Sequence, residues 1–183
     1  MDKRKLKSRT RMQSALKALL TEHDLRSISI GDLCKEAKVT RPTFYANYRD
    51  LADMLDQYLE EILEELEALH NDLNEQFTPC SQQERTTRLI QILLENLDRE
   101  DPRMQALFST MPVVLPERRF SRLVLKLIEQ SVEKDIAQMP PEKRLIVAHY
   151  FTGATLGIIR LWMQKPDAIT PQQIANIFSE LTF

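Results

Sequence analysis

The chain has 183 residues, enough for one large or two small domains with a buried core. Glycine occurs only three times and aromatic residues make up 7% of the chain, whereas Leu, Glu, Ala, Lys and Arg are abundant, so the composition favours helices. There is no signal peptide and no apolar run near the roughly 18 residues of a membrane span. We therefore expect an all-α, cytoplasmic protein without a membrane partner.

The basic residues gather at the N-terminal end, although the net charge is only −2. Residues 1–50 contain 12 Lys and Arg against six Asp and Glu, whereas residues 51–183 contain 13 against 21. Residues 2–11 hold six basic side chains before any apolar periodicity begins. This stretch is either a solubilising tail or a basic arm that lies along phosphates. The residues that follow it, described next, favour the arm, with Lys3 and Lys5 on phosphates.

The next 30 residues predict three helices, of which the second and third are short. Apolar spacing from Met12 predicts a first helix that ends near His23. A second begins after Ser29, which can cap the backbone with Asp32 three residues later, and ends near Lys38. Its single apolar face is formed by Ile30, Leu33, Cys34 and Ala37.

Thr40 and Pro42 predict the start of a third helix, from Arg41 to about Asn47. Its outer face lacks the Glu and Lys of an ordinary solvated helix and carries hydroxyls, a guanidinium, an amide and a phenol. Such groups suit base edges and phosphate oxygens. The predicted DNA-binding residues are Arg41, Thr43 and Tyr45 near bases, and Ser29, Thr40, Asn47, Tyr48, Lys3 and Lys5 on the backbone.

The string from Val39 to Leu55, VTRPTFYANYRDLADML, resembles the helix-turn-helix of the TetR/AcrR family of bacterial transcriptional regulators. Two positions depart from that family. Lys38 replaces a usual glycine, so it has to take the left-handed conformation at a cost on the order of 1 kcal/mol. Leu51 replaces a lysine that touches a phosphate in many members. The matching positions are Ala37, Val39, Thr40, Thr43, Phe44, Tyr45 and Tyr48.

The rest of the sequence predicts six further helices, which brings the expected total to about nine. From Leu51 the apolar spacing predicts one helix of more than 20 residues. An extended apolar break is expected over 111–116. The other predicted helices span 82–97, 102–108, 116–137, 141–163 and 171–183. We expect a helix-turn-helix DNA-binding domain over 1–50 and a helical ligand-binding and dimerisation domain over 51–183.

The segment 148–163 is apolar around most of its circumference, and two of its glycines are four residues apart. It is either a buried core helix or a dimer surface, and a reader of palindromic half-sites needs a two-fold partner. The resemblance adds that the last two helices of the family form a four-helix dimer bundle. The predicted interface residues are Gly153, Gly157, Arg160, Trp162, Ile174 and Phe178.

Methionine and aromatic side chains in the acidic part form either core or the lining of a pocket, and spacing alone does not decide between them. The resemblance implies a pocket for a small, largely apolar effector. The residues that we assign to it are Met104, Phe108, Met111, His149, Tyr150 and Thr152.

The sequence predicts no catalytic residue, metal site or cofactor, because it lacks a phosphate loop, a nucleophile elbow and a cluster of metal ligands. Cys34 is expected to be a small core residue, and Cys80 falls in a loop where its redox role stays open. We predict a homodimeric repressor of a palindromic operator in double-stranded DNA, released by the effector. The alternatives are a regulator controlled by a protein partner, a helical interaction protein that does not bind DNA, and an enzyme built on His149.

Overall fold

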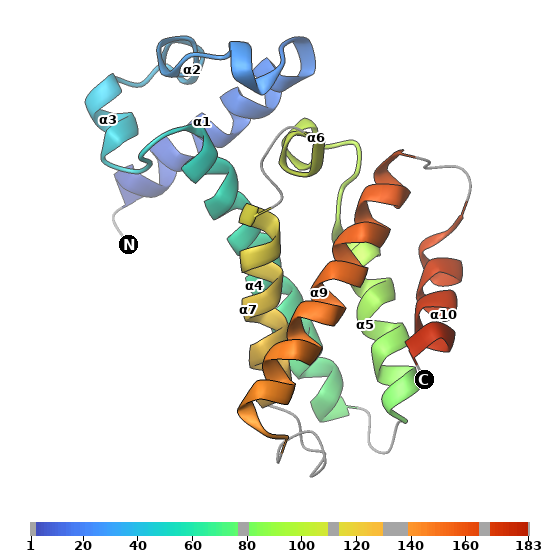
Figure 1. Ribbon diagram of the computed structural model, residues 1–183. Coiled ribbons are helices and arrows are strands. Elements are labelled where there is room, and N and C mark those ends of the chain that lie inside the picture. The colour runs from blue at the N-terminus through green and yellow to red at the C-terminus, as the bar shows by residue number, and fades with distance from the viewer. Residues whose placement is uncertain (1–2, 77–80, 110–113, 130–138, 165–168, 183) are drawn as a thin grey trace. The chain divides into compact units, whose positions relative to one another are not determined.

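The computed structural model describes residues 3–76, 81–109, 114–129, 139–164 and 169–182 (Figure 1). Over these residues it has nine α-helices, a short 3-10 turn and no strand, which confirms the all-α prediction. The chain forms two compact units, Met1–Tyr58 with Arg99–Pro112 and Leu59–Asp98 with Val113–Phe183. The predicted division after residue 50 remains a prediction about roles, since the compact units also place residues 99–112 with the N-terminal part.

The first unit contains α1 (Lys3–Glu22), a 3-10 turn (Leu25–Ser27), α2 (Ile30–Ala37), α3 (Arg41–Tyr45), the start of α4 (Leu51–Gln76) and α6 (Pro102–Ser109). Helix α1 packs against both α2 and α6, and α2 packs against α3. The basic residues predicted as an arm ahead of the first helix lie on that helix, because the chain is helical from Lys3.

The core of the first unit explains why α2 and α3, only eight and five residues long, hold their positions against α1. Phe44 of α3 is fully buried together with Leu33 of α2 and Met12 and Leu16 of α1. Complete burial of each such side chain contributes roughly 1.5–3 kcal/mol. Cys34 is also buried, and this burial raises the pKa of its thiol, as expected for an apolar packing role.

The second unit contains the rest of α4 with α5 (Gln82–Asn96), α7 (Val114–Glu129), α9 (Pro141–Gln164) and α10 (Pro171–Thr182). Helix α10 packs against α5, and α7 packs against α9 (Figure 1). Helix α7 begins two residues before the predicted start, which shortens the predicted break, and residues 110–113 lie outside the described part.

Capping and ion pairs account for much of the local order in the second unit. The Ser81 hydroxyl accepts from the Glu84 amide at 3.2 Å and the Glu84 carboxylate accepts from the Ser81 amide at 2.8 Å, which forms a capping box. Lys126 of α7 lies 2.7 Å from Glu67 of α4. The capping box fixes the start of α5, and the ion pair joins α7 to α4 at the surface.

Candidate nucleic-acid interface and apolar groove

The turn between α2 and α3 depends on Lys38, which takes the left-handed conformation with φ 52° and ψ 48°. Its backbone N–H donates to carbonyls of the last turn of α2, and Val39 donates to Cys34 at 3.0 Å. Arg11 of α1 donates to the Lys38 carbonyl at 3.0 Å. The turn therefore has the geometry that glycine favours, and α1 holds it in place.

Helix α3 is one residue longer than a single turn and is fixed at its start. The Thr40 hydroxyl accepts from the Thr43 amide at 3.3 Å and lies 2.9 Å from the Thr43 hydroxyl. Arg41 and Thr40 are exposed, and Tyr45 is 58% exposed. With Phe44 buried beneath, α3 presents a guanidinium, hydroxyls and a phenol on a supported surface.

Ser29 and Arg41 come together across the turn. The exposed Ser29 caps α2 by accepting from the Asp32 amide at 3.1 Å. The Arg41 guanidinium lies over the same first turn of α2, with its Nη2 atom 3.0 Å from the place of a Cβ on Gly31. The hydrogen bonds from Ser29 lower the pKa of the exposed Asp32 carboxyl. We call the exposed side chains of Ser29, Thr40, Arg41 and Tyr45, together with the half-buried Thr43, the polar face.

Tyr48 and Asn47, two of the residues predicted to contact the DNA backbone, do not belong to the polar face. Tyr48 is only 2% exposed and accepts from Gln13 at 3.5 Å, so its ring belongs to the core. Asn47 donates from its amide nitrogen to the Thr43 carbonyl at 2.7 Å, and its amide oxygen is buried without a partner. Neither side chain offers a free polar group to a phosphate in this conformation.

The N-terminal basic residues lie on α1. Arg4, Lys5 and Lys7 are exposed, whereas Arg9 is half-buried with its guanidinium 5.6 Å from the centre of the Tyr48 ring. The side chain of Lys3 is outside the described part. The described basic side chains thus extend the positive charge of the first unit along a helix.

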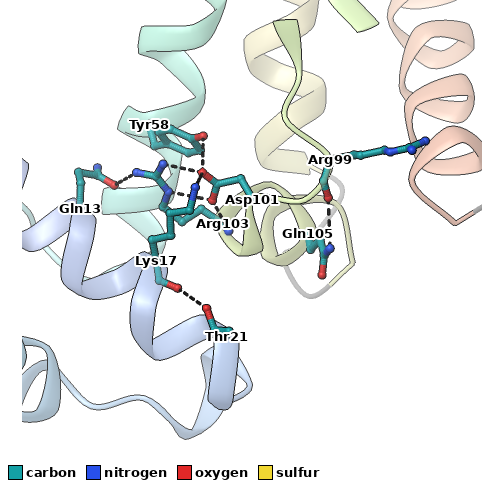
Figure 2. Close-up of polar contacts among 8 residues, drawn as sticks. All are labelled: Gln13, Lys17, Thr21, Tyr58, Arg99, Asp101, Arg103 and Gln105. Carbon is teal, nitrogen blue, oxygen red and sulfur yellow. Dashed lines mark hydrogen bonds and ion pairs between the residues drawn. The ribbon is translucent and has the colours of Figure 1, made fainter. Parts of the chain in front are cut away.

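A buried ionic cluster joins α6 to α1 and α4 within the first unit (Figure 2). Asp101 is 2% exposed and lies 3.1 Å from Lys17 and 2.6 Å from Arg103. Arg103 stacks 3.9 Å from the centre of the Tyr58 ring and donates to Gln13 at 3.2 Å. Burial opposes ionisation of Asp101, but hydrogen bonds from Arg103 and Lys17 outweigh it and lower its pKa to about 2.

This cluster was not found from the sequence. The sequence signal at Asp101 was local, a capping residue before Pro102, and the amide of Arg103 does bond the Asp101 carboxylate at 2.9 Å. The partners on α1 come from about 90 residues away, which no spacing rule identifies.

A family model described as the transcriptional regulator C-terminal region of the TetR type matches residues 84–183, which is more than half of the chain. The chain belongs to the TetR family of transcriptional regulators. The C-terminal match complements the helix-turn-helix geometry of the first unit.

Known relatives agree with this assignment. The helix-turn-helix-type transcriptional regulator YxbF of Bacillus subtilis is 25% identical over 173 residues, 93% of this chain, and the chain spans 43% of its length. NalD of Pseudomonas aeruginosa, the secondary repressor of the MexAB-OprM multidrug efflux pump, has a TM-score of 0.68 at 19% identity, with 99% of this chain and 96% of NalD covered.

The TetR-family repressor AlkX from a Dietzia strain, implicated in biodegradation of n-alkanes, has a TM-score of 0.62. It is 18% identical, and the match covers 94% of this chain and 91% of AlkX. At such identities the two solved structures show a shared fold.

The second unit of this TetR-family regulator has an apolar groove on α9 and α10. Its volume is about 380 Å³, and both Gly153 and Gly157 line it. Large apolar side chains of the two helices are exposed in or beside it, with Leu181 80% and Tyr150 59% exposed. We call this surface the apolar groove. Its lining is Tyr150, Gly153, Ala154, Gly157, Ile158, Leu161, Ile169, Ile174, Ile177, Phe178 and Leu181.

The predicted interface residues divide between this groove and the core. Ile174 and Phe178 line the groove although they are only 8% and 5% exposed. Trp162 is 6% exposed and Arg160 is half-buried, and neither lines the groove. By length and composition alone α9 could cross a membrane, with a mean hydropathy of 1.3. In a TetR-family regulator the same composition describes a helix with one apolar side in the core and another at a surface.

The predicted effector pocket does not form as assigned. Met104 and Phe108 are buried in the first unit, Thr152 is buried in the second, and Met111 is outside the described residues. His149 is exposed, with its Nδ1 atom 3.8 Å from Glu117, and Tyr150 lines the outer groove. Both side chains lie on the outward side of α9, which the apolar pattern of this helix did not reveal.

Proposed function

We propose that this protein is a homodimeric repressor that reads a palindromic operator through the polar face, with α3 of each subunit in the major groove. The observation that carries the proposal is that Arg41 and Tyr45 are exposed on a helix whose inner side is anchored by the fully buried Phe44. Rigid support of this kind keeps a hydrogen-bonding side chain aligned with a base edge.

Within this proposal each part of the first unit has a separate task. Arg41, Thr43 and Tyr45 contact bases, because they lie on α3 itself. Ser29 and Thr40 contact phosphates at the starts of α2 and α3, where free backbone N–H groups favour anions. Lys3 and Lys5 add phosphate attraction from α1 and carry no sequence information.

The direct test is Arg41→Ala with Lys5→Gln as its control. Arg41→Ala should lower discrimination between a selected operator and a scrambled duplex by about 1–3 kcal/mol. Lys5→Gln should weaken binding to both duplexes alike and reduce the slope of log K against log salt by about 1. Fluorescence anisotropy at several salt concentrations measures both. Unchanged discrimination by Arg41→Ala would reject the polar face as the reader.

The partner proposed for the apolar groove is a second copy of the chain. Two-fold pairing would cover Leu161, Ile177 and Leu181, which are 48%, 49% and 80% exposed. The glycines permit close helix contact, because an added Cβ at Gly153 or Gly157 meets nothing within 4 Å in the protomer. TetR-family regulators act as dimers, which supports this partner.

Repression is supported by the comparison with NalD and AlkX, because each is named as a repressor and has the same fold as this chain. We propose a cytoplasmic protein that blocks transcription when bound to its operator. A reporter gene placed behind the selected operator should be expressed more strongly when this protein is deleted, and weaker expression would identify an activator.

The effector proposed is a small, largely apolar molecule bound within the second unit. Thr152 is fully buried, and its hydroxyl has no hydrogen-bond partner among the residues that the structure describes, so we propose that a molecule entering this core would bond to it. Helix α4 contributes residues to both compact units and so provides one continuous helical link between effector and reader. Compounds that release operator DNA should do so less well with Thr152→Val, and an unaltered response would exclude Thr152 as a contact.

A further inference from the structure

Gly31 stands at the second position of α2, and its backbone does not explain why glycine is there. No described glycine has a positive φ, and α2 is a regular helix from Ile30 to Ala37. Glycine lowers helix stability relative to alanine, so local structure alone disfavours it. The reason has to be sought in what a side chain would touch.

A Cβ at Gly31 would lie 3.0 Å from Nη2 and 3.9 Å from Cζ of Arg41, and 3.4 Å from Oγ of Ser29. The first of these distances is shorter than the roughly 3.5–4.0 Å of ordinary van der Waals contact. The other two glycines differ, since added Cβ atoms at Gly153 and Gly157 meet nothing within 4 Å. Gly31 is therefore the glycine whose missing side chain makes room for another residue.

We propose that Gly31 is a specificity-determining position that acts through Arg41. Without a side chain at residue 31, the guanidinium rests against the first turn of α2, and from this orientation it meets the operator. A guanidinium recognises a base through two hydrogen bonds in a fixed plane, so a change in its orientation changes which base edge it fits. The inference rests on the proposed function, in which Arg41 reads a base.

Side-chain size sets the expected effect. A methyl group requires Arg41 to move by a few tenths of an ångström, because its guanidinium is the end of a flexible chain. A leucine adds three more carbon atoms beyond this Cβ, so we expect it to displace the guanidinium further than a methyl group does. Both residues have higher helix propensity than glycine, so neither substitution is expected to lower the thermal unfolding midpoint.

The test is a double-mutant cycle with Gly31→Leu, Arg41→Ala and the double variant, and with Gly31→Ala as the small-volume comparison. Gly31→Leu should reduce affinity for the selected operator by about tenfold and relax the same base position as Arg41→Ala. Gly31→Ala should act in the same direction but more weakly. In the Arg41→Ala background, Gly31→Leu should change affinity by less than about twofold.

An equal loss of affinity with and without Arg41 would overturn the inference, since the leucine would then clash with DNA by itself. The packing is checked without DNA by NMR, as a nuclear Overhauser contact between Gly31 Hα and the Arg41 side chain, expected in the unmodified protein. Its absence would overturn the inference while leaving the proposed function intact. If the contact is present but the unmodified protein binds no duplex, the proposed function and the specificity role both fail.

Discussion

The polar face of α2 and α3 and the apolar groove of α9 and α10 are both open to solvent, but they expose opposite groups. Arg41 and Thr40 form hydrogen bonds with water and can exchange them for hydrogen bonds with a polar partner. Leu181 and Tyr150 are instead stabilised when another apolar surface covers them. We therefore assign recognition to the polar face and assembly to the apolar groove. We propose double-stranded DNA as the partner of the first surface and a second copy of the chain as the partner of the second.

The largest expected effect comes from placing a charge in the apolar groove. Gly157→Glu puts a carboxylate in a place that is open in the protomer but covered in the proposed dimer. An unpaired charge buried at an interface costs about 3–5 kcal/mol, which weakens dimerisation by a factor on the order of 100 or more. Sedimentation velocity should show a monomer, and operator affinity should fall with it.

Lys143→Glu is the control for this prediction, because it changes charge at an exposed position of α9 outside the groove. It should leave the dimer intact. A Gly157→Glu protein that still sediments as a dimer would show that the groove is not the contact between subunits, and the role of the apolar groove in assembly would be rejected.

A smaller effect is expected from Asp101→Asn, which tests whether the ionic cluster holds α6 in the first unit. The substitution leaves Arg103 without its ion pair, and Arg103 is 15% exposed. We expect a loss of about 2–3 kcal/mol in unfolding free energy, below the range for a fully buried pair because Lys17 is 45% exposed. Urea titration measures this loss. An unaltered midpoint would show that the cluster adds nothing to stability.

The same carboxylate predicts a pH dependence with a definite sign. The pKa of Asp101 is lowered to about 2 from an ordinary value of 3.8, so its contribution is fully present above pH 4. Stability should fall as the pH drops from about 4 towards 2, because the unfolded chain binds the proton first. Asp101→Asn should lose less stability over this pH range than the unmodified protein.

The smallest expected effect is at Lys38, whose position in the turn is structural. Lys38→Gly should raise the unfolding free energy by about 1 kcal/mol, because glycine takes φ 52° without strain. The bond from Arg11 persists, since it is made to the backbone carbonyl. Lys38→Ala keeps the strain and should bring no gain. Equal stability of the glycine and alanine variants in thermal unfolding would contradict this.

The local structure of the first unit could be predicted because short-range physics fixes it. Ser29 with Asp32 forms the predicted capping box, and Thr40 caps α3 as expected. The left-handed turn at Lys38 followed from the helix-turn-helix resemblance. Each of these features depends on residues within a few positions of one another.

The remaining features depend on which way a side chain turns or on distant partners. The spacing of Phe44 and Tyr48 predicts that both point inward, and both are buried, which conflicts with the phosphate contact assigned to Tyr48. The helix α9 is apolar on most sides, so its pattern did not reveal that Tyr150 faces outward and Thr152 inward. The cluster at Asp101 requires the fold to bring α6 to α1.

Selection of bound sequences from a random pool of duplex DNA tests the central claim most directly. Two subunits that each place α3 in the major groove should enrich a palindrome whose half-sites are centred about 10 base pairs, or about 34 Å, apart. The unmodified protein should enrich such a site, and Arg41→Ala should lose preference at one base of each half-site. Enrichment of no palindrome, or the same site from both proteins, would contradict the account.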